Sequence, residues 1–152
     1  MTKEELKISL TELISTATFD ESGEWLNIVI TPGELLTSAE ILRSKPELNF
    51  DYMFCQTCVD WKTHLMMVYH LESTRYRHQV VVKIQIDRNK PEIETVSHIW
   101  RTSEFHEREI YELFGVNFLN HPDLRLLILP DGWEGKNPMR KDFEDPVNMI
   151  KL

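Results

Sequence analysis

Two segments near the N-terminus carry apolar residues at helical spacing. Their apolar stripes are Leu6, Leu10, Leu13, Ile14 and Ala17 in the first segment and Leu35, Leu36, Ala39 and Leu42 in the second. Thr2 and Glu5 precede the first stripe with the spacing of a capping box, and residues 31–34 give the second helix the same kind of start. Pro46 ends the second helix, because the residue before a proline is disfavoured in helical geometry. The pattern therefore predicts two N-terminal helices.

Four segments between the first helix and Asp87 have the pattern of β-strands. They are Trp25 to Ile30, Tyr52 to Val59, His64 to Leu71 and Gln79 to Asp87. In the last segment, apolar residues occupy every second position from Val80 to Ile86, which is typical of a strand buried on one face. The gaps between the last three segments are short, so they favour antiparallel neighbours.

The chain after Pro91 predicts a helical corner. The apolar residues Val96, Ile99 and Trp100 indicate a short helix. Ser103 is expected to cap a longer helix that runs to about Phe114 and ends at Gly115.

Residues 116–152 are interrupted by prolines and glycines, namely Pro122, Pro130, Gly132, Gly135 and Pro138. This composition predicts an extended arm rather than a core element. We assign residues 1–115 to a globular α+β domain and residues 116–152 to an irregular C-terminal arm of the same single domain. The expected fold has N-terminal helices packed on a mostly antiparallel sheet of about four strands, followed by the helical corner and the arm.

The composition narrows the classes of function. A chain of 152 residues and 18.1 kDa fits one domain, and its net charge of −8 argues against binding to nucleic acid or directly to anionic lipid. No apolar run approaches the roughly 18 residues that a membrane helix needs. The polar N-terminus is not a secretory signal, and the two cysteines favour a reducing compartment. Any membrane association is therefore expected to come through partner proteins.

The residues that could carry chemistry do not assemble into a known site. Cys55 and Cys58 form a C-x-x-C, but a second pair is missing, and on a strand their side chains would point to opposite faces. The pattern H-E-x-x-H fails because Ile110 follows His106 and Glu107 at the last position. We therefore predict no catalytic, cofactor-binding or metal-binding residue. A small redox or metal protein built on the cysteines and histidines is the less favoured alternative.

The helix that contains Glu107 has two interpretations. Glu104, Arg108 and Glu112 share one face and could form a ladder of ion pairs, while Glu107 lies on an adjacent face beside Tyr111 and Phe114. Spacing alone favours an ordinary solvated amphipathic helix. The arm that follows is rich in Trp, Leu, Met and Arg, which is typical of a surface that another protein buries.

A long run of residues in this region resembles a known family. The run comprises Glu107 to Gly115, His121, Arg125, Leu127 to Asp131, Trp133 to Gly135 and Pro138 to Asp142. It is similar to the motif of the C-type, thirty-kilodalton subunit of respiratory complex I, the NADH:quinone oxidoreductase. The resemblance covers about Asp51 to Asp142 and departs from the family pattern at Leu126, at Gly132 and at the pair Lys136-Asn137.

The resemblance implies a non-catalytic subunit of the peripheral arm of a proton-translocating complex. Such a subunit binds no flavin, iron–sulfur cluster or quinone itself, although the complex uses NADH, FMN, iron–sulfur clusters and quinone. Its partners would be the terminal-cluster subunit and the quinone-site subunit, and the isolated chain would be inactive. The location implied is the cytoplasmic face of the bacterial inner membrane, or its matrix or stromal equivalent.

The resemblance leaves the electron donor open, because ferredoxin-fed and hydrogenase-type relatives carry similar subunits. A free-standing adaptor whose arm recognises another partner is a further alternative. With Leu152 as its last residue, the chain is expected to be a form not fused to the quinone-site subunit. The residues that the resemblance implies at partner interfaces are Glu107, Arg108, Glu109, Tyr111, Glu112, Phe114, Gly115, His121, Asp123, Arg125, Pro130, Asp131, Trp133, Pro138, Arg140, Lys141 and Asp142.

Overall fold

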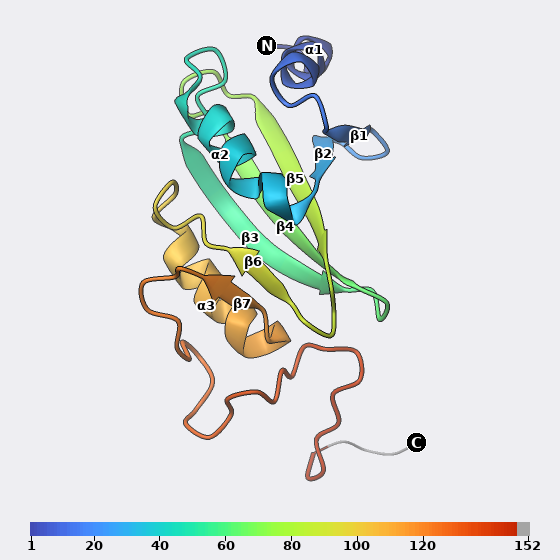
Figure 1. Cartoon of the computed structure of the whole chain (residues 1–152), viewed down its shortest axis with the longest axis vertical. Coiled ribbons are helices and arrows are strands. Elements are labelled where there is room, and N and C mark those ends of the chain that lie inside the picture. The colour runs from blue at the N-terminus through green and yellow to red at the C-terminus, as the bar shows by residue number, and fades with distance from the viewer. Residues whose placement is uncertain (149–152) are drawn as a thin grey trace.

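The computed structural model describes residues 1–148 (Figure 1). Its helices are α1 (Lys3–Leu13), the short 3-10 helix η1 (Pro32–Glu34), α2 (Leu35–Ser44) and α3 (Ser103–Phe114). Its strands are β1 (Thr18–Asp20), β2 (Leu26–Ile30), β3 (Tyr52–Asp60), β4 (Leu65–Glu72), β5 (Gln79–Ile86), β6 (Glu92–Glu94) and β7 (Asn117–Leu119). The α+β class expected from the sequence is confirmed.

The main sheet has five strands in the order β1-β2-β5-β4-β3. The neighbours β3, β4 and β5 are antiparallel, as their short connections predict. Strand β2 is parallel to β5, with Ile28 opposite Val82, because the chain crosses over through α2 before it returns to the sheet. The fifth strand, β1, was not expected: its three residues are too few for an alternating pattern to be recognised.

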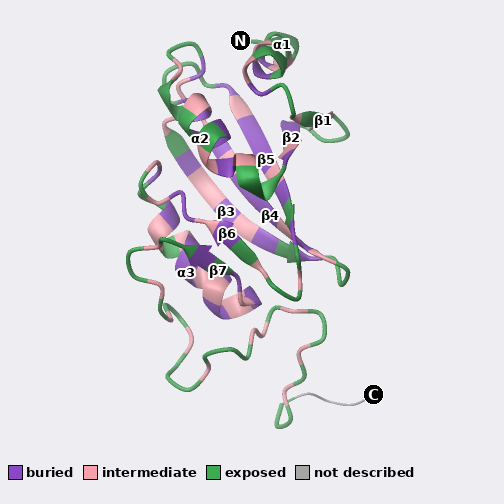
Figure 2. Cartoon of the chain, in the orientation of Figure 1, coloured by how far each residue is buried: buried purple, intermediate pink, exposed green. Residues whose placement is uncertain are grey.

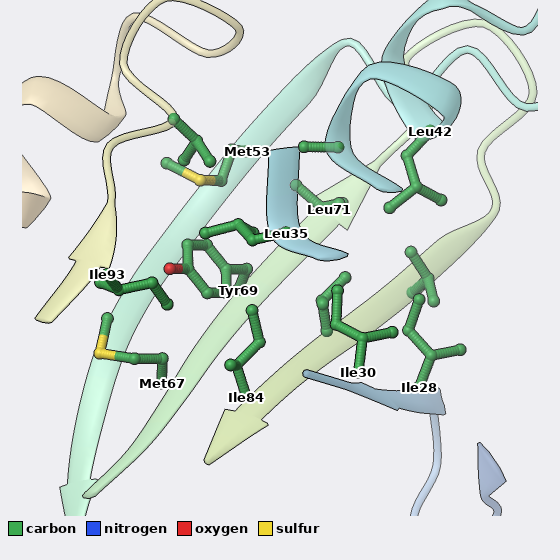
Figure 3. Close-up of a cluster of buried hydrophobic side chains, with 14 of the residues drawn as sticks. Ile28, Ile30, Leu35, Leu42, Met53, Met67, Tyr69, Leu71, Ile84 and Ile93 are labelled. Carbon is green, nitrogen blue, oxygen red and sulfur yellow. The ribbon is translucent and has the colours of Figure 1, made fainter. Parts of the chain in front are cut away.

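One face of the sheet carries the hydrophobic core. Alternating residues of β2, β4 and β5, among them Ile28, Tyr69 and Ile84, point into a cluster that Leu35 and Leu42 of α2 cover from above (Figure 3). Complete burial of an aliphatic side chain contributes roughly 1.5–3 kcal/mol, so this cluster dominates the stability of the fold. The capping boxes expected at the two N-terminal helices are present, although the second opens with η1 rather than with α-helix.

A second layer completes the core beyond β3. Strands β6 and β7 form a parallel pair, and α3, which links them, packs against β3 (Figure 1). Helix α3 ends where predicted, since Gly115 adopts the left-handed conformation with φ of 76°. Strand β7 lies inside residues 116–152, the range expected to be irregular. Between Leu119 and residue 148 the chain forms neither helix nor strand.

Two local predictions in the helical corner are wrong. The segment that contains Val96 and Trp100 is a single turn, in which the amides of Ile99 and Trp100 both donate to the Val96 carbonyl. It does not continue as a helix, and the side chains of Val96 and Trp100 at its two ends are both buried in the core. Ser103 does not cap α3 either, since its hydroxyl donates to side chains beneath the helix.

Candidate functional site on helix α3 and the C-terminal arm

Helix α3 has two faces with different surroundings. Ser103, Glu107, Ile110 and Phe114 recur every three or four residues and form the buried face that meets β3. Arg108 and Glu112 occupy the other side of the helix, yet they are buried as well. They are buried because the C-terminal arm crosses over them. The helix is thus covered by the sheet on one side and by the arm on another. The residues of the arm are themselves mostly exposed or intermediate in burial (Figure 2).

Glu107 organises the contact between α3 and the rest of the domain. Its carboxylate is 0% exposed and accepts hydrogen bonds from the Val96 amide at 2.9 Å and from the Ser103 hydroxyl at 2.8 Å. The Thr95 hydroxyl donates to its other oxygen, and the Gln56 amide lies at 3.5 Å. Because the donors come from β3, the 95–97 turn and α3, the carboxylate joins three segments of the chain.

His121 fastens the start of the arm to the N-terminal turn of α3. Its Nε2 lies 3.0 Å from the Glu104 carbonyl, and its Nδ1 accepts a hydrogen bond from the Asp123 amide at 3.0 Å. A neutral imidazole with its proton on Nε2 satisfies both contacts. The side chains of His121 and Glu107 are both enclosed, with Nε2 3.7 Å from Oε2 of Glu107.

Arg108 and Glu112 hold the next segment of the arm by its backbone. Arg108 donates from Nε to the Arg125 carbonyl at 3.1 Å and from Nη2 to the Leu126 carbonyl at 2.7 Å. Glu112 accepts hydrogen bonds from the amides of Leu127 at 2.7 Å, Ile128 at 3.0 Å and Leu129 at 3.2 Å. One carboxylate and one guanidinium therefore satisfy five main-chain groups that no sheet or helix would otherwise pair.

The ladder of ion pairs predicted for Glu104, Arg108 and Glu112 is wrong. None of the ion pairs within residues 1–148 joins any two of them. The main-chain groups of the arm occupy Arg108 and Glu112 instead. The interpretation as a solvated amphipathic helix is wrong for the same reason, because it assumed that nothing crosses the outer face.

A second attachment fixes the end of the arm to the sheet. Arg88 donates to both carboxylate oxygens of Asp60, each at 2.9 Å, and to Asp142 of the arm at 2.7 Å. The Lys141 amide donates to Asp60 at 2.8 Å. The Arg88 guanidinium beside it holds the pKa of Asp60 well below its usual range. Arg140 adds a bond of 2.7 Å to the Phe114 carbonyl, which satisfies one of the last carbonyls of α3.

Asp60 and Arg88 were not predicted as site residues from the sequence. Asp60 continues the inward positions of β3 after Gln56 and Cys58, and it is only 4% exposed. A carboxylate at an inward position of a strand is a signal that a cationic partner is required. The partner itself could not be located, because Arg88 is 28 residues away in the chain.

The structure separates the predicted interface residues into three groups. Four are enclosed by their own chain: Glu107, Arg108, Glu112 and Phe114. Seven are partly exposed as whole residues: Glu109, Tyr111, Gly115, His121, Trp133, Pro138 and Arg140. The side chain of His121 is itself fully enclosed. Six are exposed: Asp123, Arg125, Pro130, Asp131, Lys141 and Asp142. In the isolated chain, the arm and the core cover the side chains of the enclosed four. The interface role stays a prediction for all seventeen residues.

The departures from the family pattern are accommodated locally. The side chain at Leu126 is not needed by Arg108, which binds only its carbonyl. Gly132 has a positive φ of 88°, which glycine adopts without strain. In the extra pair, the Lys136 ammonium lies 4.4 Å from the centre of the Trp133 ring. The Asn137 side chain packs against Gly115 so closely that a Cβ added to Gly115 would lie 2.6 Å from Asn137 Nδ2.

The two cysteines lie on opposite faces of β3, as their spacing predicts. Cys58 is paired with Met67 on the core face, whereas Cys55 is opposite His70 on the other face. Burial raises the pKa of the Cys58 thiol to about 12, which makes it a poor nucleophile and ligand. In the part of the chain described, residues 1–148, no group of three or more histidine, cysteine or acidic side chains is arranged to hold a metal ion. In the same range no helix combines the length and apolar character needed to cross a membrane.

The chain is similar to subunits of an oxidoreductase and of a dehydrogenase. It is 40% identical over 115 residues to the C/D-type subunit of the NADH-quinone oxidoreductase of Phocaeicola vulgatus, a match that covers 74% of this chain and 22% of the relative. It is 42% identical over 104 residues to the C-type subunit of the F(420)H(2) dehydrogenase of Methanosarcina mazei, covering 66% of this chain and 65% of the relative. The chain thus spans less than two thirds of the length of both relatives.

A solved structure has the same fold. A chain of the membrane-bound sulfane sulfur reductase, an archaeal respiratory membrane complex, superposes with a TM-score of 0.79 at 31% identity. The superposition covers 93% of this chain and 85% of the other. The model of the family described as respiratory-chain NADH dehydrogenase, 30 Kd subunit, matches residues 28–147. This range includes most of β2, all of β3 to β7 and the arm up to residue 147. The chain therefore belongs to the family of the 30 kDa subunit of the respiratory-chain NADH dehydrogenase.

Proposed function

We propose that this chain is a non-catalytic structural subunit in the peripheral arm of a proton-translocating NADH:quinone oxidoreductase. The observation that carries the proposal is that buried charged groups attach the C-terminal arm of this chain to α3 and β3. Arg108 and Glu112 hold it at one point, and Asp60 with Arg88 holds it at the other. Such attachments keep an extended segment in one fixed shape. Electron transfer between cofactors depends on fixed positions of the subunits that hold them. A subunit that keeps those neighbouring subunits in place therefore needs a fixed shape itself.

The partners proposed are the subunit that holds the terminal iron–sulfur cluster and the subunit that forms the quinone site. The designation C/D of the Phocaeicola vulgatus relative supports a contact with the quinone-site subunit, which we take to be the D-type part. The designation describes a C-type and a D-type part in one protein. NADH, FMN, the clusters and quinone would be bound by other subunits of the complex. The chain would lie at the cytoplasmic face of the membrane, or its matrix or stromal equivalent, through these partners.

A related complex with another electron donor is the second candidate. The relatives that favour it are the F(420)H(2) dehydrogenase subunit at 42% identity and the sulfane sulfur reductase chain at 31%. The two candidates differ in what the purified complex oxidises. NADH-dependent quinone reduction supports the first, and reduction with F420H2, ferredoxin or hydrogen, but not with NADH, supports the second.

Affinity purification from detergent-solubilised membranes of the source organism tests the structural role. A tagged copy of the chain is expected to carry the other subunits of a membrane-embedded complex with it. The chain produced alone is expected to show neither flavin nor cluster absorbance and no oxidation of NADH. Elution as a small free species from gently prepared extracts, or stoichiometric iron in the isolated chain, would contradict the proposal.

A further inference from the structure

We propose, on the basis of the structural role proposed above, that the turn between β3 and β4 is an anchor for a neighbouring subunit. The turn, residues 61–64, lies at the end of the main sheet where β3 stops (Figure 1). Its Trp61 would insert into an apolar pocket with an acidic rim on that subunit. None of the four residues belongs to the interface set that the family motif suggested. Trp61 is 60% exposed, although tryptophan buries more apolar area than most residues when it is covered.

Trp61 continues a small apolar patch on the side of the sheet that faces away from the core. Its amide donates to the His64 carbonyl at 3.0 Å, so the pairing of the two strands extends to it. Side chains alternate along a strand, which places Trp61 on the same side as Val59 and opposite to the buried Asp60. Val59 is 38% exposed and lies directly across from Met66 of β4. The register of the strands therefore makes this surface continuous.

Buried groups beneath the turn hold it in one shape. The Asp60 carboxylate accepts a hydrogen bond from the Lys62 amide at 2.8 Å. The Arg88 guanidinium and the Lys141 amide bind the same carboxylate and fix it to the rest of the domain. Lys62 has a φ of 69°, a conformation that a lysine keeps only where its surroundings impose it. Trp61 is therefore presented in an ordered position, so its burial by a partner costs little conformational entropy.

The turn at the opposite end of β4 is satisfied within the chain itself. It also contains an aromatic side chain next to a cation, and there the Arg75 guanidinium lies 5.1 Å from the centre of the Tyr76 ring. Tyr76 is in addition stacked on His78, with 5.7 Å between the ring centres. Among residues 1–148, by contrast, Trp61 takes part in no ring or cation–π contact and Lys62 in no ion pair. These two side chains are available to a partner.

The chemistry of the turn specifies the surface that it fits. The indole ring of Trp61 needs apolar walls, and its N–H needs an acceptor once the ring leaves water. The Lys62 ammonium adds three donors and a positive charge. Carboxylates at the rim of an apolar pocket would satisfy both groups through charge-assisted hydrogen bonds. Because the chain as a whole carries a net charge of −8, an acidic partner is repelled by most of its surface and attracted at this turn.

The size of the patch separates a neighbouring subunit from a second copy of this chain. A stable interface between two free proteins buries about 1,200–2,000 Å² in total. A large aromatic side chain supplies roughly 150–250 Å², so one turn provides only a fraction of what a dimer needs. The turn therefore serves as one anchor in an assembly that is held by further contacts. The family to which the chain belongs is that of a respiratory-chain dehydrogenase subunit, so the occupant is a neighbouring subunit.

Matched substitutions in the two turns of β4 test the anchor. Trp61→Ala and Lys62→Glu are compared with Tyr76→Ala and Arg75→Glu, which make the same kinds of change at the other end of the strand. Each tagged variant replaces the chain in its source organism, and the complex is purified from detergent-solubilised membranes. After a high-salt wash, we expect about tenfold less of the other subunits per tagged chain for each anchor variant, and less than about a twofold change for each control. Unchanged melting temperatures would show that the loss is not one of folding.

A photo-crosslink identifies the occupant in the assembled complex, even if a substitution impairs folding. With p-benzoylphenylalanine in place of Trp61, illumination is expected to join this chain to a peptide of another subunit that contains aspartate or glutamate. The same group in place of Tyr76 is expected to give no such product. Crosslinking only to a second copy or to lipid, no crosslink in a complex that holds this chain, or full retention in the anchor variants would overturn the anchor and leave the structural role intact. If the unsubstituted chain associates with no subunit of such a complex, the structural role itself fails.

Discussion

The Glu112 carboxylate accepts a hydrogen bond from the backbone amide of Ile128 at 3.0 Å, across a separation of 16 residues. The amides of Leu127 and Leu129 donate to the same carboxylate, so three consecutive residues of the arm depend on one side chain. Glu112 owes its own burial to this segment. The helix and the arm therefore order each other, and loss of one carboxylate should release the arm without unfolding the core.

Replacement of Glu112 by alanine is expected to free residues 127–129 from α3. Hydrogen bonds to charged groups contribute about 1.5–3 kcal/mol each, so amide exchange in this segment should accelerate by at least tenfold. Hydrogen exchange followed by mass spectrometry of a peptide spanning residues 124–130 measures the effect. Glu109→Ala, at a partly exposed position of the same helix, is the control. Equal exchange rates in both variants would mean that Glu112 does not hold the arm.

Glu107→Ala is expected to destabilise the isolated domain. The substitution leaves the Val96 amide without its buried acceptor, whereas the hydroxyls of Thr95 and Ser103 can still donate to Ser97 and Gln56. An unsatisfied buried group costs about 1–3 kcal/mol, so we expect a loss of stability in that range. For a domain of this size, each kcal/mol lowers the melting temperature by roughly 2–4 °C.

The resemblance implies instead that Glu107 lies at a partner interface, in which case its loss would affect assembly more than the stability of the isolated domain. Thermal unfolding followed by circular dichroism distinguishes the two, with Glu104→Ala as the control because only the main-chain carbonyl of Glu104 is used by His121. A melting temperature unchanged by Glu107→Ala, together with lost assembly, would restore the role in assembly.

The regular elements could be predicted because their signals are local. Alternation between Val80 and Ile86 identified β5, and Gly115 identified the end of α3. The burial of Arg108 and Glu112 could not be predicted in the same way, because it depends on a segment more than ten residues away that lacks any periodic pattern. The family motif identified the right region, but a motif does not separate residues that contact a partner from residues that hold the contacting surface in place.

Stability in acid should depend on Asp60. Its pKa is held below the usual value by the Arg88 guanidinium, so the folded state binds its proton less readily than the unfolded state. The stabilisation is therefore present above the unfolded pKa of about 3.9 and is lost as the pH falls through and below that value. The free energy of unfolding in urea can be measured at several pH values between about 6 and about 2.5. It should depend less steeply on pH for Asp60→Asn than for the unsubstituted chain.

The control for this experiment is Asp87→Asn, since Asp87 is exposed and accepts only a local bond from the Asn89 amide. Asp87→Asn should retain the full pH dependence. If both variants lose it equally, the acid sensitivity arises from the overall charge of the chain rather than from the Asp60–Arg88 pair.

Gly115→Ala is expected to weaken the exit of α3 for two separate reasons. Gly115 has a φ of 76°, a conformation that costs an L-residue roughly 1–2 kcal/mol, and an added Cβ would lie 2.6 Å from Nδ2 of Asn137. The two contributions can be separated with Asn137→Ala, which removes the clash but not the backbone strain. The double variant should therefore recover part, but not all, of the loss in the free energy of urea unfolding. Gly33→Ala is the control, because nothing lies within 4 Å of a Cβ added there. Complete recovery in the double variant would show that the left-handed backbone at Gly115 carries no strain for alanine, and that packing against the arm alone requires glycine.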